Sequence, residues 1–393
     1  MYRIGTEELD EIGKVIASKT LFRMGSAANG HQQEVERFER EWAATIGVEH
    51  ALLLSGGGTG ALILALEALG IGPGDEVLVP AYTWMATANA AVAVGAIPVL
   101  VEIDESLGMD PVDVERKMTP NVKAIIPVHI AGRPCDMHRL LEVANRHEVA
   151  VIEDCCQCDG GSYAGRRVGS YGRLAAFSFN DFKILSCGEG GAVVTSDRTL
   201  YDRARVYHDP LTTFASFASD LTVETSVGHQ MRASELHGAV MRVQLQRLEG
   251  ILSDLRRISA RFRNELASTS LRLAPSNDQI GDCGINAAFQ FATADEARAF
   301  ATAEGVGGGR PIDTGRHVYS NWEPIMHRRA GHHADMNPFT FPQNKRLRMD
   351  YCPTMCPRTL DILARTVYIA VNPDWTSTQV DERIAACRNA AHR

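Results

Sequence analysis

Short apolar runs alternate with helical patterns over the first half of the chain. The runs at residues 51–54, 76–79, 97–101, 124–128, 149–153, 174–179 and 192–195 are predicted to be buried strands. Residues 59–69, with apolar side chains on one face, and residues 137–147 are predicted to be helices between them. This alternation predicts an α/β fold with a doubly wound, mostly parallel sheet and helices on both of its faces.

The pattern changes after residue 233. Apolar side chains keep near-helical spacing from Leu236 to Ile258, amid many arginines, which predicts one long amphipathic helix. Because such a helix commonly leads from one domain into the next, we expect a large domain over residues 1–250 and a smaller α+β domain over residues 251–393. Residues 315–345 are rich in His, Pro, Asn and Arg without clear periodicity, so we expect a long loop of the kind that is often functional.

The composition excludes several classes of protein. The chain has 393 residues, of which 45% are hydrophobic and 22% charged, as in ordinary globular proteins. Its 40 basic and 48 acidic residues give a net charge of −8, which offers no electrostatic footprint for a nucleic-acid partner. Residues 77–101 could span a membrane by length, but Pro80, Gly95 and Pro98 favour a strand, a loop, a small-residue helix and a second strand. Since the N-terminus is acidic where a signal peptide would be apolar, we expect a cytoplasmic protein with no membrane partner.

The nine cysteines are an odd number in a chain without a visible export signal, so reduced thiols are expected. Cys155, Cys156 and Cys158 lie close together, as do Cys352 and Cys356, but neither group has paired C-x-x-C spacing. We therefore expect these side chains to pack as small buried residues, with no metal site.

A glycine-rich turn follows the first predicted strand, in the sequence Ser55-Gly-Gly-Gly-Thr59-Gly60. A helix is predicted to begin directly after it, and the free N–H groups and the dipole of a helix start favour a phosphate. The spacing fits neither the dinucleotide fingerprint, which fails at Ala61, nor a P-loop, which needs a following Lys-Ser or Lys-Thr. A phosphate cradle and a plain strand-to-helix turn are both consistent with this motif.

Polar side chains follow the strand predicted at residues 149–153. Asp154 stands at the carboxyl end of this strand, where an open parallel sheet binds its ligands, and Gln157 offers an amide to the same region. By itself such a carboxylate could bind a ribose, a metal or the ring nitrogen of a pyridine cofactor, or simply cap a helix.

A lysine follows the strand predicted at residues 174–179. Lys183 comes shortly after Ser178 in the segment FSFNDFK, with Phe179 and Phe182 as neighbours. A lysine held in apolar surroundings becomes a Schiff-base nucleophile, whereas a lone lysine is normally solvated. The chain order of phosphate turn, aspartate, serine and lysine is typical of fold-type-I pyridoxal-phosphate enzymes.

Five segments resemble the DegT/DnrJ/EryC1/StrS family of sugar and cyclitol aminotransferases. They are GDEVLVPAYTWMATANA, PVHIAGRPCDM, VIEDCCQCDG, FSFNDFK and GEGGAVVTSD, in the order typical of that family. The resemblance covers residues 50–250, and the remainder matches only loosely. The segments around Lys183 look most like the branch that holds the scyllo-inosose aminotransferases and aminohydroxybenzoate synthase.

This resemblance implies pyridoxal 5′-phosphate as the cofactor, with a role for each matching residue. Lys183 would form the Schiff base and then move the proton between the substrate carbon and the cofactor. Asp154 would pair with the protonated pyridine nitrogen, and Trp84 would stack on the ring face. Gln157 would lie near the phenolic oxygen.

The same resemblance implies that Gly58, Thr59 and Ser178 bind the cofactor phosphate. Gln230 stands where the family often has an asparagine that reaches the phosphate in the partner subunit, with the same amide on a longer arm. A homodimer with shared active sites is therefore implied. His129, in the segment PVHIAG, is either a wall residue of the active site or a satisfied buried histidine.

The implied activity is a ping-pong transfer of an amino group. Glutamate or glutamine would be the donor, and a keto sugar or keto-cyclitol of antibiotic or other secondary metabolism would be the acceptor. The sequence leaves the acceptor open, because residues 209–228 and 315–345 match the family poorly. Candidate contacts to its phosphate or hydroxyl groups in the second segment are Arg316, His317, Tyr319, His327, Arg328 and Arg329. A solvated loop face explains these six side chains equally well.

Three alternatives remain. A sugar dehydratase of the same fold would have histidine in place of Lys183. A regulatory descendant without activity would have no reason to keep the lysine, the aspartate, the serine and the phosphate turn together. A nicotinamide-dependent oxidoreductase would need an acidic residue at the carboxyl end of a strand, about twenty positions after the glycines, and Glu76 stands at the beginning of its strand instead.

Overall fold

The computed structural model describes residues 3–391, and its larger part is built on a seven-stranded sheet in the order β1-β9-β8-β5-β4-β2-β3. The strands are β1 (His50–Leu54), β2 (Glu76–Pro80), β3 (Ile97–Val101), β4 (Val122–Ile125), β5 (Ala150–Asp154), β8 (Leu174–Ser178) and β9 (Gly191–Thr195). Neighbours from β8 to β3 pair in parallel, whereas β9 is antiparallel to both β1 and β8. The predicted α/β, mostly parallel fold is confirmed.

The antiparallel strand has a simple cause. A parallel return needs a crossover of a dozen or more residues, usually a helix. Residues 179–190 between β8 and β9 contain no helix, so the chain turns back directly beside β8. Lys183 lies in this connection, at the carboxyl edge of the parallel strands.

Helices cover both faces because alternate side chains of a strand point to opposite sides. Val77 and Val79 of β2 pack in one core with α3 (Gly57–Leu69) and α4 (Ala86–Ala93). Leu78, between them, packs in another core with α5 (Pro111–Arg116) and α6 (Met137–Arg146). The segment at residues 77–101 is thus β2, α4 and β3, as predicted, and no helix of the described chain is both long and apolar enough to cross a membrane.

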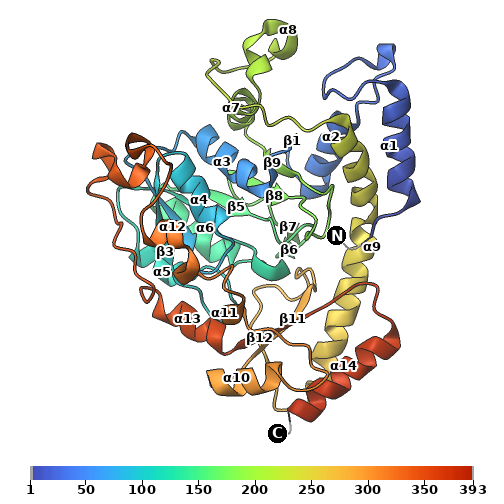
Figure 1. The fold of residues 1–393 in the computed structure, drawn as a ribbon, viewed down its shortest axis with the longest axis vertical. Coiled ribbons are helices and arrows are strands. Elements are labelled where there is room, and N and C mark those ends of the chain that lie inside the picture. Colours follow the sequence, from blue (N-terminus) through green and yellow to red (C-terminus); the bar gives the residue numbers. More distant parts are fainter. Residues whose placement is uncertain (1–2, 392–393) are drawn as a thin grey trace.

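The predicted long helix is α9 (Glu235–Glu265), which runs along one side of the molecule (Figure 1). Its first half packs against α1 (Thr6–Ser18) and α2 (Glu34–Ile46). Residue 250 lies within α9, so no break in the helix marks the expected domain boundary. The boundary stays a prediction. Smaller elements of this part are β6 (Ser162–Tyr163), β7 (Arg166–Arg167), α7 (Arg198–His208) and α8 (Ala215–Ala218).

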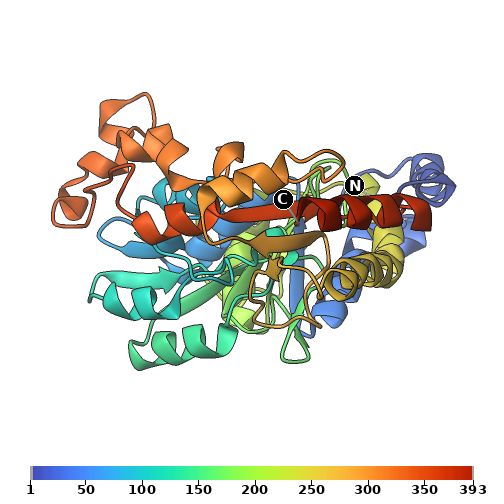
Figure 2. The same cartoon turned by 90° about the horizontal axis from the view of Figure 1, so that it is seen from below.

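The last third of the chain forms a three-stranded antiparallel sheet with helices around it. Its strands are β10 (Arg272–Leu273), β11 (Asn286–Gln290) and β12 (Thr366–Ala370), and its helices are α10 (Ala294–Ala301), α11 (Pro311–Thr314), α12 (Glu323–Met326), α13 (Pro357–Ala364) and α14 (Ser377–Ala390). Viewed from this end of the molecule, α14 lies beside the end of α9 (Figure 2). The expected loop at residues 315–345 is irregular chain that contains α12 and single 3-10 turns.

Candidate active site

A cavity of about 560 Å³ opens at the carboxyl ends of β5 and β8, beside the start of α3. Seven of the eight residues predicted for the site line it: Gly58, Thr59, Trp84, Asp154, Gln157, Ser178 and Lys183. The eighth, Gln230, is exposed in the segment before α9 and does not line the cavity. The structure therefore brings together residues from four separate segments of the chain and leaves Gln230 apart.

The Asp154 carboxylate is buried and held by two donors. Its Oδ2 accepts a hydrogen bond from the Thr87 hydroxyl at 2.8 Å, and its Oδ1 accepts from the Cys156 N–H at 3.1 Å. The Thr83 hydroxyl lies 2.9 Å from that of Thr87 and donates to it, since the Thr87 proton is committed to Asp154. The sequence did not predict this chain of hydroxyls. Its signal is the four-residue spacing of Thr83 and Thr87, which lie before and within a helix.

The side-chain oxygen of Gln157 also takes part in a hydrogen bond within the fold. It accepts a hydrogen bond from the Ala131 N–H at 3.0 Å. Because an amide has one oxygen and one NH₂ group, this contact leaves the NH₂ of Gln157 to donate. The NH₂ group of Gln157 is thus a neutral hydrogen-bond donor in the cavity that Asp154 also lines.

The start of α3 fits the phosphate of the expected cofactor. No side chain of the described residues caps this helix, so the N–H groups of its first turn remain open to an anion. A Cβ on Gly58 would lie 2.6 Å from the Cys156 Sγ and 3.0 Å from the Ser178 Cβ, so only glycine leaves the cradle open. The Thr59 and Ser178 side chains line the same cavity.

The surroundings of Lys183 differ from the expectation. Phe179 packs edge-on against Phe38 and Trp42 in the core, with ring centroids 5.7 and 5.6 Å apart, and Phe182 is 86% exposed at the rim of the cavity. The alternation of β8 explains this, because Ser178 faces the cavity and the next side chain faces away. The two phenyl rings therefore do not enclose Lys183, contrary to the prediction.

Two of the six candidates in residues 315–345 reach the cavity. Arg316 and His317 line it, and the His317 ring lies 5.6 Å from the half-exposed ring of Trp84. Burial, together with the charges of Lys183 and Arg316, lowers the pKa of His317 to about 4, so its imidazole is neutral at physiological pH.

The other four candidates do not line the cavity. The Tyr319 hydroxyl is used inside the fold, where it donates to the Pro353 carbonyl at 2.8 Å and accepts from the Cys356 N–H at 2.9 Å. His327, Arg328 and Arg329 do not line the cavity. These side chains follow directly on the short helix α12, a position that a segment without periodicity could not reveal.

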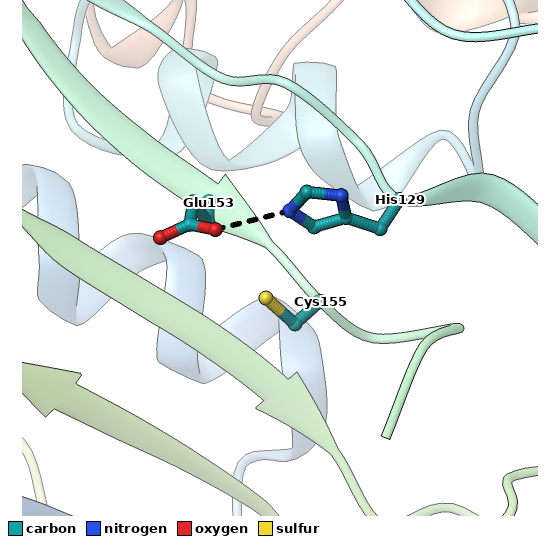
Figure 3. Close-up of side chains that lie close together, drawn as sticks. All are labelled: His129, Glu153 and Cys155. Carbon is teal, nitrogen blue, oxygen red and sulfur yellow. Dashed lines mark hydrogen bonds and ion pairs between the residues drawn. The ribbon is translucent and has the colours of Figure 1, made fainter. Parts of the chain in front are cut away.

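His129 is a satisfied buried histidine. Its Nδ1 accepts from the Cys135 N–H at 3.0 Å, and its Nε2 donates to Glu153 at 3.1 Å (Figure 3). Glu153 also accepts from three backbone N–H groups, and Cys155 completes a set of three side chains that could in principle hold a metal ion. Since the histidine and the carboxylate are already saturated with hydrogen bonds, this network is a structural support beneath Asp154.

The cysteines are all free. Cys155 and Cys158 are fully buried, as expected, whereas Cys156 lines the cavity and Cys352 is exposed, which contradicts the expected buried packing. Cys356, directly before α13, is fully buried as expected, so one member of this pair is buried and the other is exposed.

An uncapped helix start, a doubly held aspartate and a cavity lysine, at one edge of this sheet, define a fold-type-I enzyme that uses pyridoxal 5′-phosphate. Residues 3–306 match the model of the DegT/DnrJ/EryC1/StrS aminotransferase family, and the chain belongs to this family. The resemblance inferred from the sequence is confirmed, and so is the cofactor.

Known relatives agree with this assignment. The chain is 38% identical over 267 residues to the spore coat polysaccharide biosynthesis protein SpsC of Bacillus subtilis (strain 168), an alignment that covers 66% of each chain. It is 43% identical over 182 residues to L-glutamine:2-deoxy-scyllo-inosose aminotransferase of Micromonospora echinospora, covering 45% of this chain and 43% of the relative. The matched parts thus span less than two thirds of these relatives. Among solved structures, 3-amino-5-hydroxybenzoic acid synthase superposes with a TM-score of 0.80 at 25% identity, covering 100% of this chain and 98% of the other.

Proposed function

We propose that this protein transfers an amino group from glutamate or glutamine to a keto sugar or keto-cyclitol, in the cytoplasm and in the biosynthesis of an antibiotic or another amino-sugar metabolite. The observation that carries the proposal is the single cavity that joins Lys183, Asp154 and the uncapped start of α3. The similarity to relatives named for a scyllo-inosose and a polysaccharide pathway supports the acceptor class.

The bound cofactor supplies an electron sink for the negative charge that develops at the carbon bearing the amino group. Lys183 Nζ holds the cofactor and moves the proton at that carbon in both half-reactions. Asp154, oriented by Thr87, would keep the pyridine nitrogen protonated. The Gln157 NH₂ would donate to the phenolic oxygen, and Trp84 would cover the ring.

The remaining groups bind and orient. Thr59, Ser178 and the N–H of Gly58 hold the phosphate at the start of α3. Arg316 has no ion-pair or hydrogen-bond partner for its guanidinium within the described chain, so it is available for the donor carboxylate. The neutral His317 can exchange hydrogen bonds with acceptor hydroxyls.

Absorbance spectroscopy tests the activity. The protein loaded with pyridoxal 5′-phosphate is expected to show the visible band of a lysine-linked cofactor and to lose it when glutamate or glutamine is added. Lys183→Ala should lack the band, whereas Lys123→Ala, an exposed lysine on β4, should keep it. If Lys183→Ala retains the band, or neither amino acid changes the spectrum of the wild type, the proposal is wrong.

A homodimer with shared active sites is the assembly we propose, in which exposed Gln230 of one subunit reaches the phosphate of the other. Mixing Lys183→Ala and Gln230→Ala subunits tests it, because a mixed dimer regains one intact site when the two residues act across the interface. Activity above that of either variant alone is expected. An unchanged activity after subunit exchange would exclude the shared site.

A further inference from the structure

A second hollow of about 580 Å³ lies between the second half of α9 and the segment that leads into β11. It shares no lining residue with the active-site cavity. Four arginines line it, so we name it the arginine hollow: Arg133, Arg256, Arg257 and Arg263.

The hollow exists because small side chains face one another across it. On α9, Arg256, Ala260 and Arg263 follow one another at intervals of three and four residues, so they share one face of the helix. Ala260 leaves a gap between the two arginines. Ala274 and Ala288 line the opposite wall and are equally short.

Within residues 3–391, two of the four guanidinium groups form no ion pair with a carboxylate. Arg133 lies 3.5 Å from Asp282, and Arg257 lies 3.1 Å from Asp254. Arg256 donates only to backbone carbonyls, at 2.9 Å to Asp282 and 3.4 Å to Gly281. Arg263 has neither an ion pair nor a hydrogen bond within the part of the chain that the structure describes.

The acidic side chains of the hollow do not neutralise this excess. Asp282 pairs with Arg133 and also attracts Arg256 and Arg263 electrostatically, and Glu249 forms an ion pair with Arg167 outside the hollow. The four arginines of the hollow thus face only these two carboxylates among its lining residues. In addition, Ser276 lines the hollow, and its buried hydroxyl oxygen has no hydrogen-bond partner among residues 3–391. A buried hydroxyl of this kind is costly unless a partner satisfies it.

We propose that the arginine hollow is a second ligand site, which binds the phosphate ester of a small organic molecule. Guanidinium groups match the oxygens of a phosphate in a bidentate geometry. Arg263 is free to bind in this way, and Arg256 can add a donor through the nitrogen that does not bond to the Asp282 and Gly281 carbonyls. The volume is that of a small-molecule pocket and far exceeds a bare phosphate ion. Ser276 and the amide of Asn286 would contact the organic part.

Calorimetric titration of the protein saturated with pyridoxal 5′-phosphate tests the site, because the bound cofactor blocks the phosphate cradle of α3. AMP and glucose 6-phosphate serve as phosphate-ester probes, and glutarate is the carboxylate probe. At least one phosphate ester is expected to bind at one site per chain, and glutarate is expected to bind more weakly. Arg263→Gln should weaken this binding by about tenfold or more.

Two further variants separate charge from space. Ala260→Leu fills the hollow without changing its charge and should also weaken binding. Arg261→Gln removes a charge two residues from Arg263, but Arg261 pairs with Glu265 and Asp381 outside the hollow, so this control should bind like the wild type. The proposal is overturned if neither phosphate ester binds, or if glutarate binds as tightly as the phosphate ester. It is also overturned if both Arg263→Gln and Ala260→Leu still bind the phosphate ester like the wild type while showing a normal cofactor spectrum.

Discussion

The hydroxyl of Thr87 on α4 donates a hydrogen bond of 2.8 Å to the carboxylate of Asp154 at the end of β5. Two elements that are far apart in the sequence thus fix the carboxylate expected to face the pyridine nitrogen. A hydrogen bond to a charged group contributes about 1.5–3 kcal/mol, so the orientation of Asp154 depends strongly on this contact.

Replacing Thr87 by valine keeps the shape of the side chain and removes the donor. We expect Thr87→Val to lower kcat by about tenfold or more, because Asp154 then holds the ring nitrogen less firmly. Steady-state kinetics and the dissociation constant of the cofactor measure this effect. Thr87→Ser, which restores the hydroxyl, should recover most of the activity, and equal activity of the valine and serine variants would contradict the role.

Gly58 is expected to tolerate no side chain. Its Cβ would lie 2.6 Å from the Cys156 Sγ and 3.0 Å from the Ser178 Cβ, so Gly58→Ala should weaken cofactor binding by about tenfold or more. Fluorescence titration with pyridoxal 5′-phosphate gives the affinity. Gly13→Ala is the control, since a Cβ there would meet no described residue within 4 Å beyond its chain neighbours and the backbone of its own helix.

A double variant identifies the contact that matters. Cys156→Ala removes the sulfur atom but leaves Ser178 in place, so Gly58→Ala combined with Cys156→Ala should recover only part of the affinity. If the double variant binds no better than Gly58→Ala alone, the sulfur is not the obstacle.

The sheet and most of the cavity could be predicted because they depend on local patterns. Apolar runs gave the strands, and Asp154, Ser178 and Lys183 follow strand ends, which meet at one edge of the sheet. The direction of β9 could not be predicted from its own composition, since a buried strand is apolar whichever way it runs. The orientation of Phe179 does follow from the sequence, because side chains alternate along a strand and Phe179 comes directly after Ser178. Its closeness to Lys183 in the sequence suggested the opposite orientation.

In the segment at residues 315–345, by contrast, the positions of the side chains could not be predicted from the sequence. Arg316 and Arg329 belong to the same irregular stretch, yet only the first lines the cavity. Position in such a segment is set by long-range contacts, such as the Thr83 N–H bonded to the His317 carbonyl at 2.9 Å. No periodic pattern records contacts of this kind.

Asp159 is expected to make stability depend on pH. Burial raises the pKa of its carboxyl group to about 8, against the charge of Lys183 and the N–H of Leu185, whereas the ordinary value is 3.8. Between these values the unfolded chain releases a proton that the folded protein keeps. The free energy of unfolding should therefore fall as pH rises from about 4 to about 8.

Asp159→Asn removes this titration. The variant should be more stable than the wild type by a margin that grows from pH 5 to pH 8, which urea unfolding at each pH can measure. Asp220 provides a control of opposite sign, because Arg205 and Arg198 lower its pKa to about 2. Asp220→Asn should lose stability at neutral pH and approach the wild type as pH falls through that value. A constant margin for Asp159→Asn at all pH values would rule out the buried titration.

Arg316 is expected to bind the carboxylate of the amino donor, because its guanidinium lines the cavity without an ion-pair partner in the described chain. Arg316→Gln should raise the KM for glutamate or glutamine by about tenfold or more, since a charged hydrogen bond is lost, while the KM for the ketone acceptor stays near its wild-type value. Arg329→Gln, in the same irregular segment but paired with Glu323 outside the cavity, should change neither constant. Half-reaction kinetics with each substrate separate the two effects. If the KM for the acceptor rises instead, Arg316 binds the ketone and the donor carboxylate depends on another cation.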